Sequence, residues 1–193
     1  MPSPLVDPLP RPVPRLERQI DGIALSEWPG RRGPLLCLGD PLGSLPDLAE
    51  ALATGLSPDW RVIQPSLSAE APYQAHAAGV LWLLDTFGFE QPVLLGTGLG
   101  GGVALLVAAW YPTRVAGLVL VNHALTSARR RKIAALADEQ PAWRAWLDAP
   151  PAWSRLERQV VCPVLRVRAR AVRRVLLDTR TFLDSRVKSE RCC

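Results

Sequence analysis

The sequence predicts an α/β protein built on a mostly parallel β-sheet with helices on both faces. Short apolar runs of the buried-strand type alternate with longer segments whose apolar residues recur at helical spacing. Helices that connect consecutive strands make those strands parallel and cover both faces of the sheet. A chain of 193 residues that is 48% hydrophobic and 21% charged can bury one sizeable core but not two comfortable domains.

The N-terminal part of the chain predicts an arm, a hairpin and a buried strand. The first 14 residues contain six prolines, which lack amide donors, so this segment is expected to be an extended arm outside the core. Residues 16–20 and 23–28 flank Asp21-Gly22, a dipeptide typical of two-residue hairpin turns. The apolar run over residues 34–38 predicts the first buried strand.

The middle of the chain carries the regular alternation. A helix that Ser44 and Asp47 can cap is expected to run to Leu56, with Gly55 near its end. Further elements are then expected in turn: strands over residues 61–64, 93–95 and 115–121, and helices over residues 73–87 and 103–110. Gly88 ends the first of these two helices, and Tyr111-Pro112 ends the second.

Beyond Asn122 the pattern changes. Residues 164–169 alternate apolar and arginine side chains, which is typical of a half-exposed edge strand, and the apolar spacing from Val172 to Val187 predicts a packed basic helix. The expected organisation is an arm over residues 1–14, a core over residues 15–126, a short helical cap-like insertion over residues 127–160, and a last strand and basic helix over residues 161–193.

Charge and cysteine content argue against several classes of protein. Residues 1–100 hold 6 arginines and 11 acidic groups, whereas residues 101–193 hold 17 basic and 7 acidic groups, within a net charge of +5. The Arg-rich second half is interpreted as a solvated face rather than a nucleic-acid-binding surface. Four cysteines without a C-x-x-C or Cys/His cluster exclude a disulfide scaffold and a zinc site, which favours a reduced, cytoplasmic setting. No secretory signal is expected at the N-terminus.

The most informative stretch is residues 93–122, VLLGTGLGGGVALLVAAWYPTRVAGLVLVN. It resembles the nucleophile-elbow region of the α/β-hydrolase superfamily, with the helix and strand that follow the elbow. Residues 34–44 resemble the first core strand and oxyanion loop of that family, residues 81–88 the helix before the elbow strand, and residues 161–165 the strand after the cap. The resemblance covers residues 15–126 and implies a degenerate, truncated α/β-hydrolase-like fold.

The catalytic residues of that family do not carry over to this sequence. The elbow of the family is G-x-S-x-G, but here it is Gly96-Thr97-Gly98-Leu99-Gly100, so Gly98 stands where the nucleophile is expected. The oxyanion loop of the family usually begins His-Gly, and the matching pair here is Gly39-Asp40. The triad also needs a late histidine, whereas His76 and His123 are the two histidines of the chain and neither lies beyond the cap-like segment. Three altered elements together predict a protein without triad hydrolysis.

The other candidate catalytic side chains are interpreted as structural. Thr97 is expected to fill the turn, and Cys37 to act as a small hydrophobe on a buried strand. His76 on a helix and His123 just after a strand are expected to be satisfied structural histidines. Asp178 and Asp184 fall on the last helix rather than on a loop after a strand.

A dinucleotide site is an alternative interpretation of the same glycines. Gly96-x-Gly98-x-x-Gly101 follows a strand and precedes a helix, so it satisfies the G-x-G-x-x-G pattern, whose helix N-terminus attracts a pyrophosphate. Two features weaken this alternative: about 90 residues precede the pattern, and Asn122 occupies the place of the expected acidic residue.

Two membrane interpretations are weaker. Residues 91–113 carry no charge and contain Gly96-x-x-x-Gly100, but five glycines within seven residues make a poor centre for a spanning helix. The terminal Cys192-Cys193 resembles the doubly prenylated ending of Rab-type small GTPases, but the chain has no P-loop.

The leading functional interpretation is a binding or interaction module with the hydrolase fold, without cofactor or metal. Its expected partner is another protein, a second copy of the chain, or a small apolar ligand beneath the tryptophan-bearing cap. The alternatives are a residual or partner-completed ester- or amide-type hydrolase, and the dinucleotide binder. The absent last strand and histidine also fit a truncated or frame-shifted gene product, although the regular apolar spacing from Val172 to Val187 counts against a random tail. Neither nucleic-acid nor membrane binding is favoured.

Overall fold

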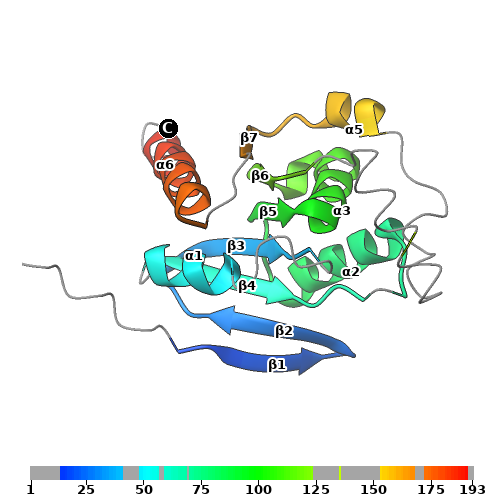
Figure 1. Cartoon of the computed structure of the whole chain (residues 1–193), viewed down its shortest axis with the longest axis horizontal. Coiled ribbons are helices and arrows are strands. Elements are labelled where there is room, and N and C mark those ends of the chain that lie inside the picture. Colours follow the sequence, from blue (N-terminus) through cyan, green and yellow to red (C-terminus); the bar gives the residue numbers. More distant parts are fainter. Residues whose placement is uncertain are drawn as a thin grey trace, which may run out of the picture.

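The structure is a computed structural model, and it describes residues 14–40, 48–56, 59–68, 70–123, 153–167 and 172–190, together with residue 135. Within this part of the chain, one sheet has the strand order β1-β2-β4-β3-β5-β6-β7 (Figure 1). The strands are β1 (Leu16–Ile20), β2 (Ile23–Trp28), β3 (Arg32–Leu38), β4 (Trp60–Pro65), β5 (Val93–Thr97), β6 (Gly117–Val121) and β7 (Val164–Val167). The helices are α1 (Leu48–Leu56), α2 (Tyr73–Thr86), α3 (Gly98–Trp110), η1 (Pro112–Arg114), α5 (Trp153–Gln159) and α6 (Val172–Glu190).

The sheet is mostly parallel, as the sequence predicts. Strands β3 to β7 pair in parallel, and the β1–β2 hairpin joins the sheet antiparallel to β4. The carboxyl ends of the five parallel strands therefore lie along one edge. Strand β4 lies on one side of β3 and β5 on the other, so the order of the strands reverses between β3 and β5. In open α/β sheets such a reversal is where ligands bind.

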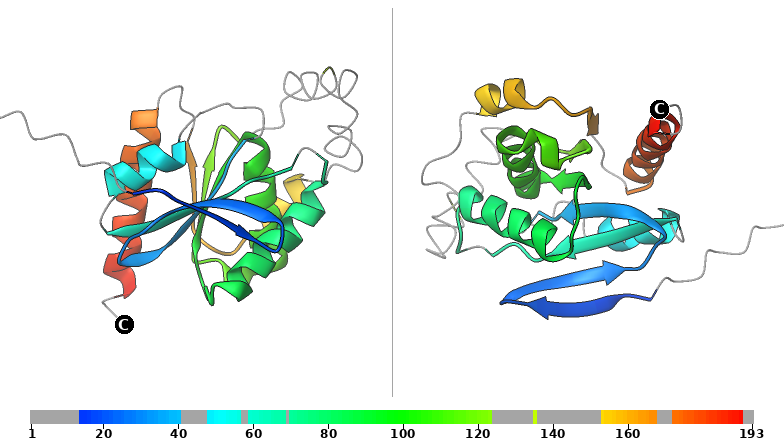
Figure 2. Two further views of the ribbon diagram at one scale, coloured as in Figure 1. Left: turned by 90° about the horizontal axis from the view of Figure 1, so that it is seen from below. Right: turned by 180° about the vertical axis from the view of Figure 1, so that it is seen from behind.

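Helices cover both faces of the sheet, which confirms the predicted layering. Helices α1 and α6 lie on one face, and α2, α3 and α5 lie on the other (Figure 2). Each face buries its own apolar cluster. The first contains Leu36, Leu94 and Leu118 with residues of α2 and α3, and the second contains Leu35, Leu95 and Val119 with residues of α1 and α6. This alternation along each strand is what a sheet buried on both faces requires.

The predicted hairpin turn is confirmed. Asp21 has a φ of 47° and Gly22 a φ of 83°, so both central residues are left-handed. Two left-handed central residues define the two-residue turn whose twist matches that of paired strands. The register is regular from Leu16 opposite Glu27 to Ile20 opposite Ile23.

A buried carboxylate ties the hairpin to the rest of the sheet. Glu27 on β2, with a 5% exposed side chain, accepts from Arg61 Nη2 on β4 at 2.7 Å and pairs with Arg18 Nε on β1 at 3.0 Å. The Arg61 guanidinium also lies over the stacked rings of Phe87 and Phe89, 5.4 and 5.0 Å from their centroids. Arg61 therefore joins strands β2 and β4, which are neighbours in the sheet, to the C-terminal end of α2.

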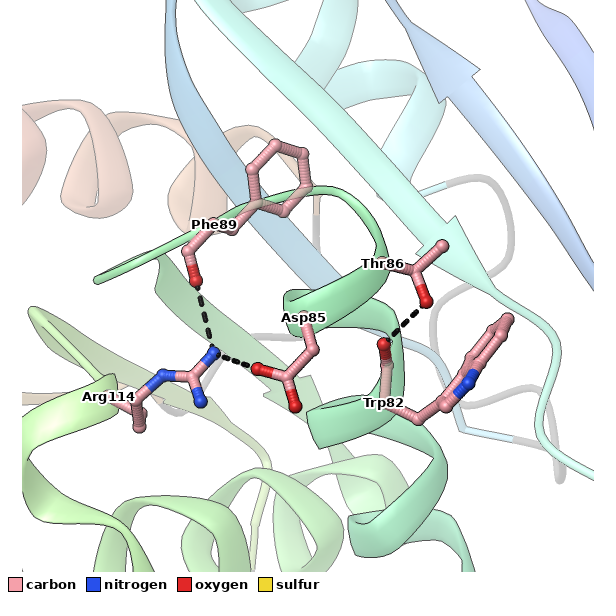
Figure 3. A network of polar contacts seen from close by, with 5 residues as sticks. All are labelled: Trp82, Asp85, Thr86, Phe89 and Arg114. Atoms are coloured by element: carbon pink, nitrogen blue, oxygen red, sulfur yellow. Dashed lines mark hydrogen bonds and ion pairs between the residues drawn. The ribbon is translucent and has the colours of Figure 1, made fainter.

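A second polar network fixes the C-terminal end of α2 against η1, the short helix that follows α3. Arg114 Nη2, on η1, donates to Asp85 Oδ1 at 2.7 Å and to the carbonyl oxygen of Phe89 at 3.4 Å (Figure 3). Within α2, Thr86 Oγ1 donates to the carbonyl oxygen of Trp82 at 2.8 Å. Because Phe89 lies just before β5 and Arg114 just before β6, this network holds the entry points of two neighbouring strands.

Several boundaries differ from the sequence prediction. Helix α3 begins at Gly98 rather than at Val103, because close packing of its glycines outweighs their low helix propensity. Strand β6 begins at Gly117 rather than at residue 115. The expected caps Ser44 and Asp47 lie outside the described residues, as do the N-terminal arm to residue 13, most of the cap-like insertion, residues 168 and 169 of the expected edge strand, and Cys192-Cys193.

The C-terminal elements agree with the prediction where they are described. Strand β7 is the last strand of the sheet, with Val167 buried and Arg166 exposed. In α6, Val175, Thr179 and Leu183 are fully buried. A Cβ atom added to Gly55 of α1 would lie 2.5 Å from Leu176 Cδ1, so the two helices are in close contact. None of the described helices is both long enough and apolar enough to cross a bilayer.

Candidate functional site

The candidate site is the turn from β5 into α3, at the reversal of strand order. Strand β5 ends at Thr97 and helix α3 begins at the next residue, so no loop separates the two elements. Thr97 is extended, with φ −110° and ψ 134°, whereas Gly98 has a φ of 51°. That left-handed value favours glycine, since a side chain there meets the following carbonyl. Gly98 thus allows the chain to change from strand to helix within one residue.

The glycines around Gly98 allow the backbones of β3, β5 and α3 to approach one another closely. A Cβ atom at Gly100 would overlap the carbonyl oxygens of Leu38 and Gly39 at the end of β3. A Cβ atom at Gly96 would lie 2.5 Å from the Cα of Gly101. These positions require glycine for packing, so the glycine-rich sequence is explained by the contact between the turn and β3.

His123 lies beside this turn. It follows β6, the strand next to β5, and its Nδ1 is 3.3 Å from the carbonyl oxygen of Gly98. Because a carbonyl oxygen can only accept, Nδ1 carries the hydrogen of this contact. The ring also faces Gly101, where an added Cβ would lie 2.9 Å from Nδ1. Burial lowers the pKa of His123, partly opposed by the Gly98 carbonyl and the charge of Glu157. The imidazole is therefore neutral at neutral pH.

Gly39 and Asp40 lie at the carboxyl end of β3, on the other side of the reversal. Asp40 is half-buried and lines a cavity of about 210 Å³, together with Ser26, Gln64 and the chain just after β4. A Cβ atom at Gly39 would lie 3.0 Å from Gln64 Nε2, so the side chain of Gln64 closes over this backbone. Asp40 thus places a carboxylate at the carboxyl end of β3.

The other sequence candidates do not supply an exposed nucleophile at the described turn. Thr97 is 3% exposed, and strand alternation places it on the α1/α6 face with Val93 and Leu95. Its hydroxyl makes no capping hydrogen bond to α3. Cys37 is buried, and desolvation raises the pKa of its thiol to about 12, which keeps it in the unreactive protonated form.

His76 belongs to a different region of the molecule. It lies on α2, and its Nε2 is 2.9 Å from the carbonyl oxygen of Ser68 in the segment after β4. Burial lowers its pKa, although hydrogen bonds to the backbone of Ser68 and Ala71 oppose this effect. His76 therefore holds the segment after β4 against α2.

The sequence places His123 just after a strand as a structural histidine, but it does not predict the contact of this residue with Gly98 at the elbow position. One signal could have found it: β5 and β6 are consecutive parallel strands, so the residues that follow them lie at the same edge of the sheet. Among the described residues, no three His, Cys, Asp or Glu side chains gather to hold a metal ion.

The glycines of the G-x-G-x-x-G pattern pack against other parts of the protein. Gly96 packs against Gly101, and Gly101 faces the His123 ring. Asn122, which stands where the acidic residue is expected, has a left-handed φ of 50°. The glycines of the pattern are thus explained without a pyrophosphate.

Comparisons with known proteins agree on the fold. The family model for the alpha/beta hydrolase fold matches residues 35–187. A putative lipase from Acinetobacter baumannii AYE is 15% identical with a TM-score of 0.64, over 92% of this chain and 93% of its own. A bacterial membrane phospholipase A is 15% identical with a TM-score of 0.62, over 91% and 87%. The alpha/beta hydrolase MGS-MChE2, from the sediment metagenome of the lagoon of Mar Chica in Morocco, is 18% identical with a TM-score of 0.57, over 92% and 100%. A search of the curated proteins gave no match.

Proposed function

The chain belongs to the α/β-hydrolase fold family, and we propose that it acts as a binding or interaction module that has lost triad hydrolysis. One observation carries this proposal. Gly98, with its φ of 51°, occupies the strand-to-helix turn at which this fold presents its nucleophile. Glycine has no side chain and cannot form a covalent intermediate. The turn therefore keeps the geometry of the elbow without its reacting atom.

Two further features support the same proposal. Asp40 brings a carboxylate to the end of β3, where hydrolases of this fold stabilise a developing negative charge, and a second negative charge there opposes that stabilisation. His123 directs its Nδ1 hydrogen at the backbone of Gly98. It thereby braces the turn through the ring nitrogen that a triad histidine directs at a carboxylate.

A partner-completed hydrolase is the second candidate. The observation that favours it is again His123, because a neutral imidazole beside the elbow could accept a proton from a hydroxyl that another chain supplies. Three structural neighbours, described as an alpha/beta hydrolase, a phospholipase and a putative lipase, carry hydrolase names. This candidate requires activity that appears only when a second protein is added.

The test uses a fluorophosphonate probe and p-nitrophenyl esters of short acids on the purified full chain. We expect no labelling and no hydrolysis above buffer. The variant Gly98→Ser, which restores a hydroxyl at the elbow, is expected to stay inactive, because His123 Nδ1 lies against the Gly98 carbonyl rather than a carboxylate that would orient a triad imidazole. Stoichiometric labelling of the wild type would contradict the loss of hydrolysis. Labelling that appears only with a co-purifying protein would favour the second candidate.

The same preparation tests the dinucleotide alternative. Calorimetric titration with NAD and NADP is expected to give no heat of binding. Micromolar affinity that vanishes in Gly98→Ser would overturn the proposal, because an added side chain at this glycine blocks the approach of a pyrophosphate.

A further inference from the structure

A cavity of about 350 Å³ lies beside α2, at the carboxyl end of β4. The turn of the β1–β2 hairpin, the segment after β4 and one side of α2 form its walls. Its volume falls at the lower end of the range found for small-molecule pockets. None of its lining residues belongs to the β5–α3 turn.

Small residues on α2 and on the β1–β2 hairpin create this space. The wall from α2 includes Ala75 and Gly79, and the hairpin contributes Gly22 and Ala24. A Cβ atom at Gly79 would meet only Ile23 Cδ1, at 3.7 Å, so there is room for further atoms between the helix and the hairpin. The cavity runs inward from the exposed Ala75 to Val80 and Leu83, each 2% exposed.

The lining carries no carboxylate, lysine or arginine. His76 is its one titratable residue, and burial keeps this imidazole neutral at neutral pH. Burying an unpaired charge in such surroundings is unfavourable, so the lining selects against ions. It also offers hydrogen bonding at one end. Ser68 Oγ accepts the amide of Glu70 at 3.0 Å, which leaves the hydroxyl hydrogen of Ser68 to donate.

We propose that this cavity binds a small, neutral, mostly apolar molecule with one hydrogen-bonding group, such as a medium-chain alcohol or a phenol. At about 30 Å³ for each water-sized volume, the space holds about a dozen non-hydrogen atoms. The apolar part lies against Val80 and Leu83, and the polar group lies toward Ser68. This site does not depend on whether the elbow is catalytic.

The probe is 1-octanol, with octanoate as its charged counterpart of equal chain length, titrated by calorimetry and by ligand-observed NMR. We expect saturable binding of the alcohol that is about tenfold or more tighter than that of the carboxylate, because the lining has no cation to pair with it. The variant Ala75→Leu places a larger side chain at the mouth and is expected to weaken binding about tenfold or more. Ala78→Leu is the matched control, because Ala78 is also exposed on α2 but does not line the cavity.

A second variant keeps the test valid if Ala75→Leu folds poorly. Gly79→Ala adds one methyl group inside the cavity at an ordinary contact distance from Ile23, so it folds normally and weakens binding of the alcohol. The proposal is overturned if the wild type binds no 1-octanol up to its solubility, if octanoate binds equally well, or if Ala78→Leu weakens binding as much as Ala75→Leu. The result of the fluorophosphonate experiment does not bear on these outcomes. The proposed loss of hydrolysis and the proposed ligand cavity can therefore be contradicted independently of each other.

Discussion

His123 Nδ1 lies 3.3 Å from the carbonyl oxygen of Gly98, so a side chain from the end of β6 holds the one residue that turns β5 into α3. The contact joins neighbouring parallel strands at the edge where their carboxyl ends meet. It also uses the ring nitrogen that carries hydrogen, which fixes the tautomer of the neutral imidazole. The turn is thereby braced from β6 on one side and packed against β3, through Gly100, on the other.

The left-handed conformation of Gly98 predicts the cost of a side chain there. Gly98→Ala is expected to lower the free energy of unfolding by about 1–2 kcal/mol, because an L-residue is disfavoured at a φ of 51°. Urea denaturation followed by circular dichroism measures the change. Gly79→Ala is the control: it lies within α2 without steric conflict, and alanine there is expected to raise stability by up to about 1 kcal/mol. Equal effects at both positions would contradict the strained turn.

The two histidines predict a loss of stability on mild acidification. The pKa of His76 and that of His123 both lie below the ordinary value of 6.5, chiefly because of burial. Between the native and unfolded pKa values the unfolded chain binds more protons, so stability present at neutral pH is lost as the pH falls below about 6.5. The slope is at most about 1.4 kcal/mol per pH unit for each histidine.

Urea denaturation between about pH 7.5 and pH 5.5 checks this slope, a range chosen to stay above the ordinary carboxylate pKa values. His76→Gln and His123→Gln should each flatten the dependence. A stability that rises on acidification, or a slope that neither variant changes, would show that the histidines are not the groups responsible.

The buried carboxylate of Glu27 predicts strong dependence on Arg61. Arg61→Met is expected to destabilise the fold by about 3–5 kcal/mol, because it removes the closest partner of a buried charge. Arg31→Met is the matched control, since Arg31 pairs with Asp59 at 3.3 Å where both side chains are exposed, and such a pair contributes about 1 kcal/mol or less. Thermal unfolding of both variants separates the two cases. Similar losses would contradict this prediction, because they would show that the buried pair contributes no more to stability than an exposed one.

Thr179 predicts a stabilising substitution in α6. Its side chain is fully buried, and its hydroxyl has no hydrogen-bond partner among the described residues. Thr179→Val replaces that hydroxyl by a methyl group of similar shape and is expected to raise stability by about 1 kcal/mol. Thr181→Val serves as control, because Thr181 is exposed and its hydroxyl donates to the Leu177 carbonyl at 3.0 Å. A loss of stability in Thr179→Val would show that the hydroxyl is bonded in solution.

The sequence predicted those features that depend on local chemistry. Asp21-Gly22 specifies its turn through two residues, so the hairpin could be predicted without knowledge of its surroundings. The start of α3 could not be predicted in this way, because a run of glycines has low helix propensity. Its helical conformation depends on the packing of Gly100 against the β3 backbone. The contact between His123 and Gly98, and the cavity beside α2, each join segments far apart in the chain. They depend on strand order, which periodicity does not reveal.

The place of β4 in the sheet has a consequence for the order of folding. Strands β2 and β3 are neighbours in the sequence, but β4 lies between them and pairs with both. The hairpin can form early from local contacts, yet it has no strand to join until β4 has been synthesised, because β2 pairs with β4 and not with β3. During synthesis, therefore, the first two strands must wait for residues up to Pro65 to leave the ribosome. Until then their hydrogen-bonding edge is open to other chains, which makes early exposure of the hairpin the moment of greatest risk for aggregation.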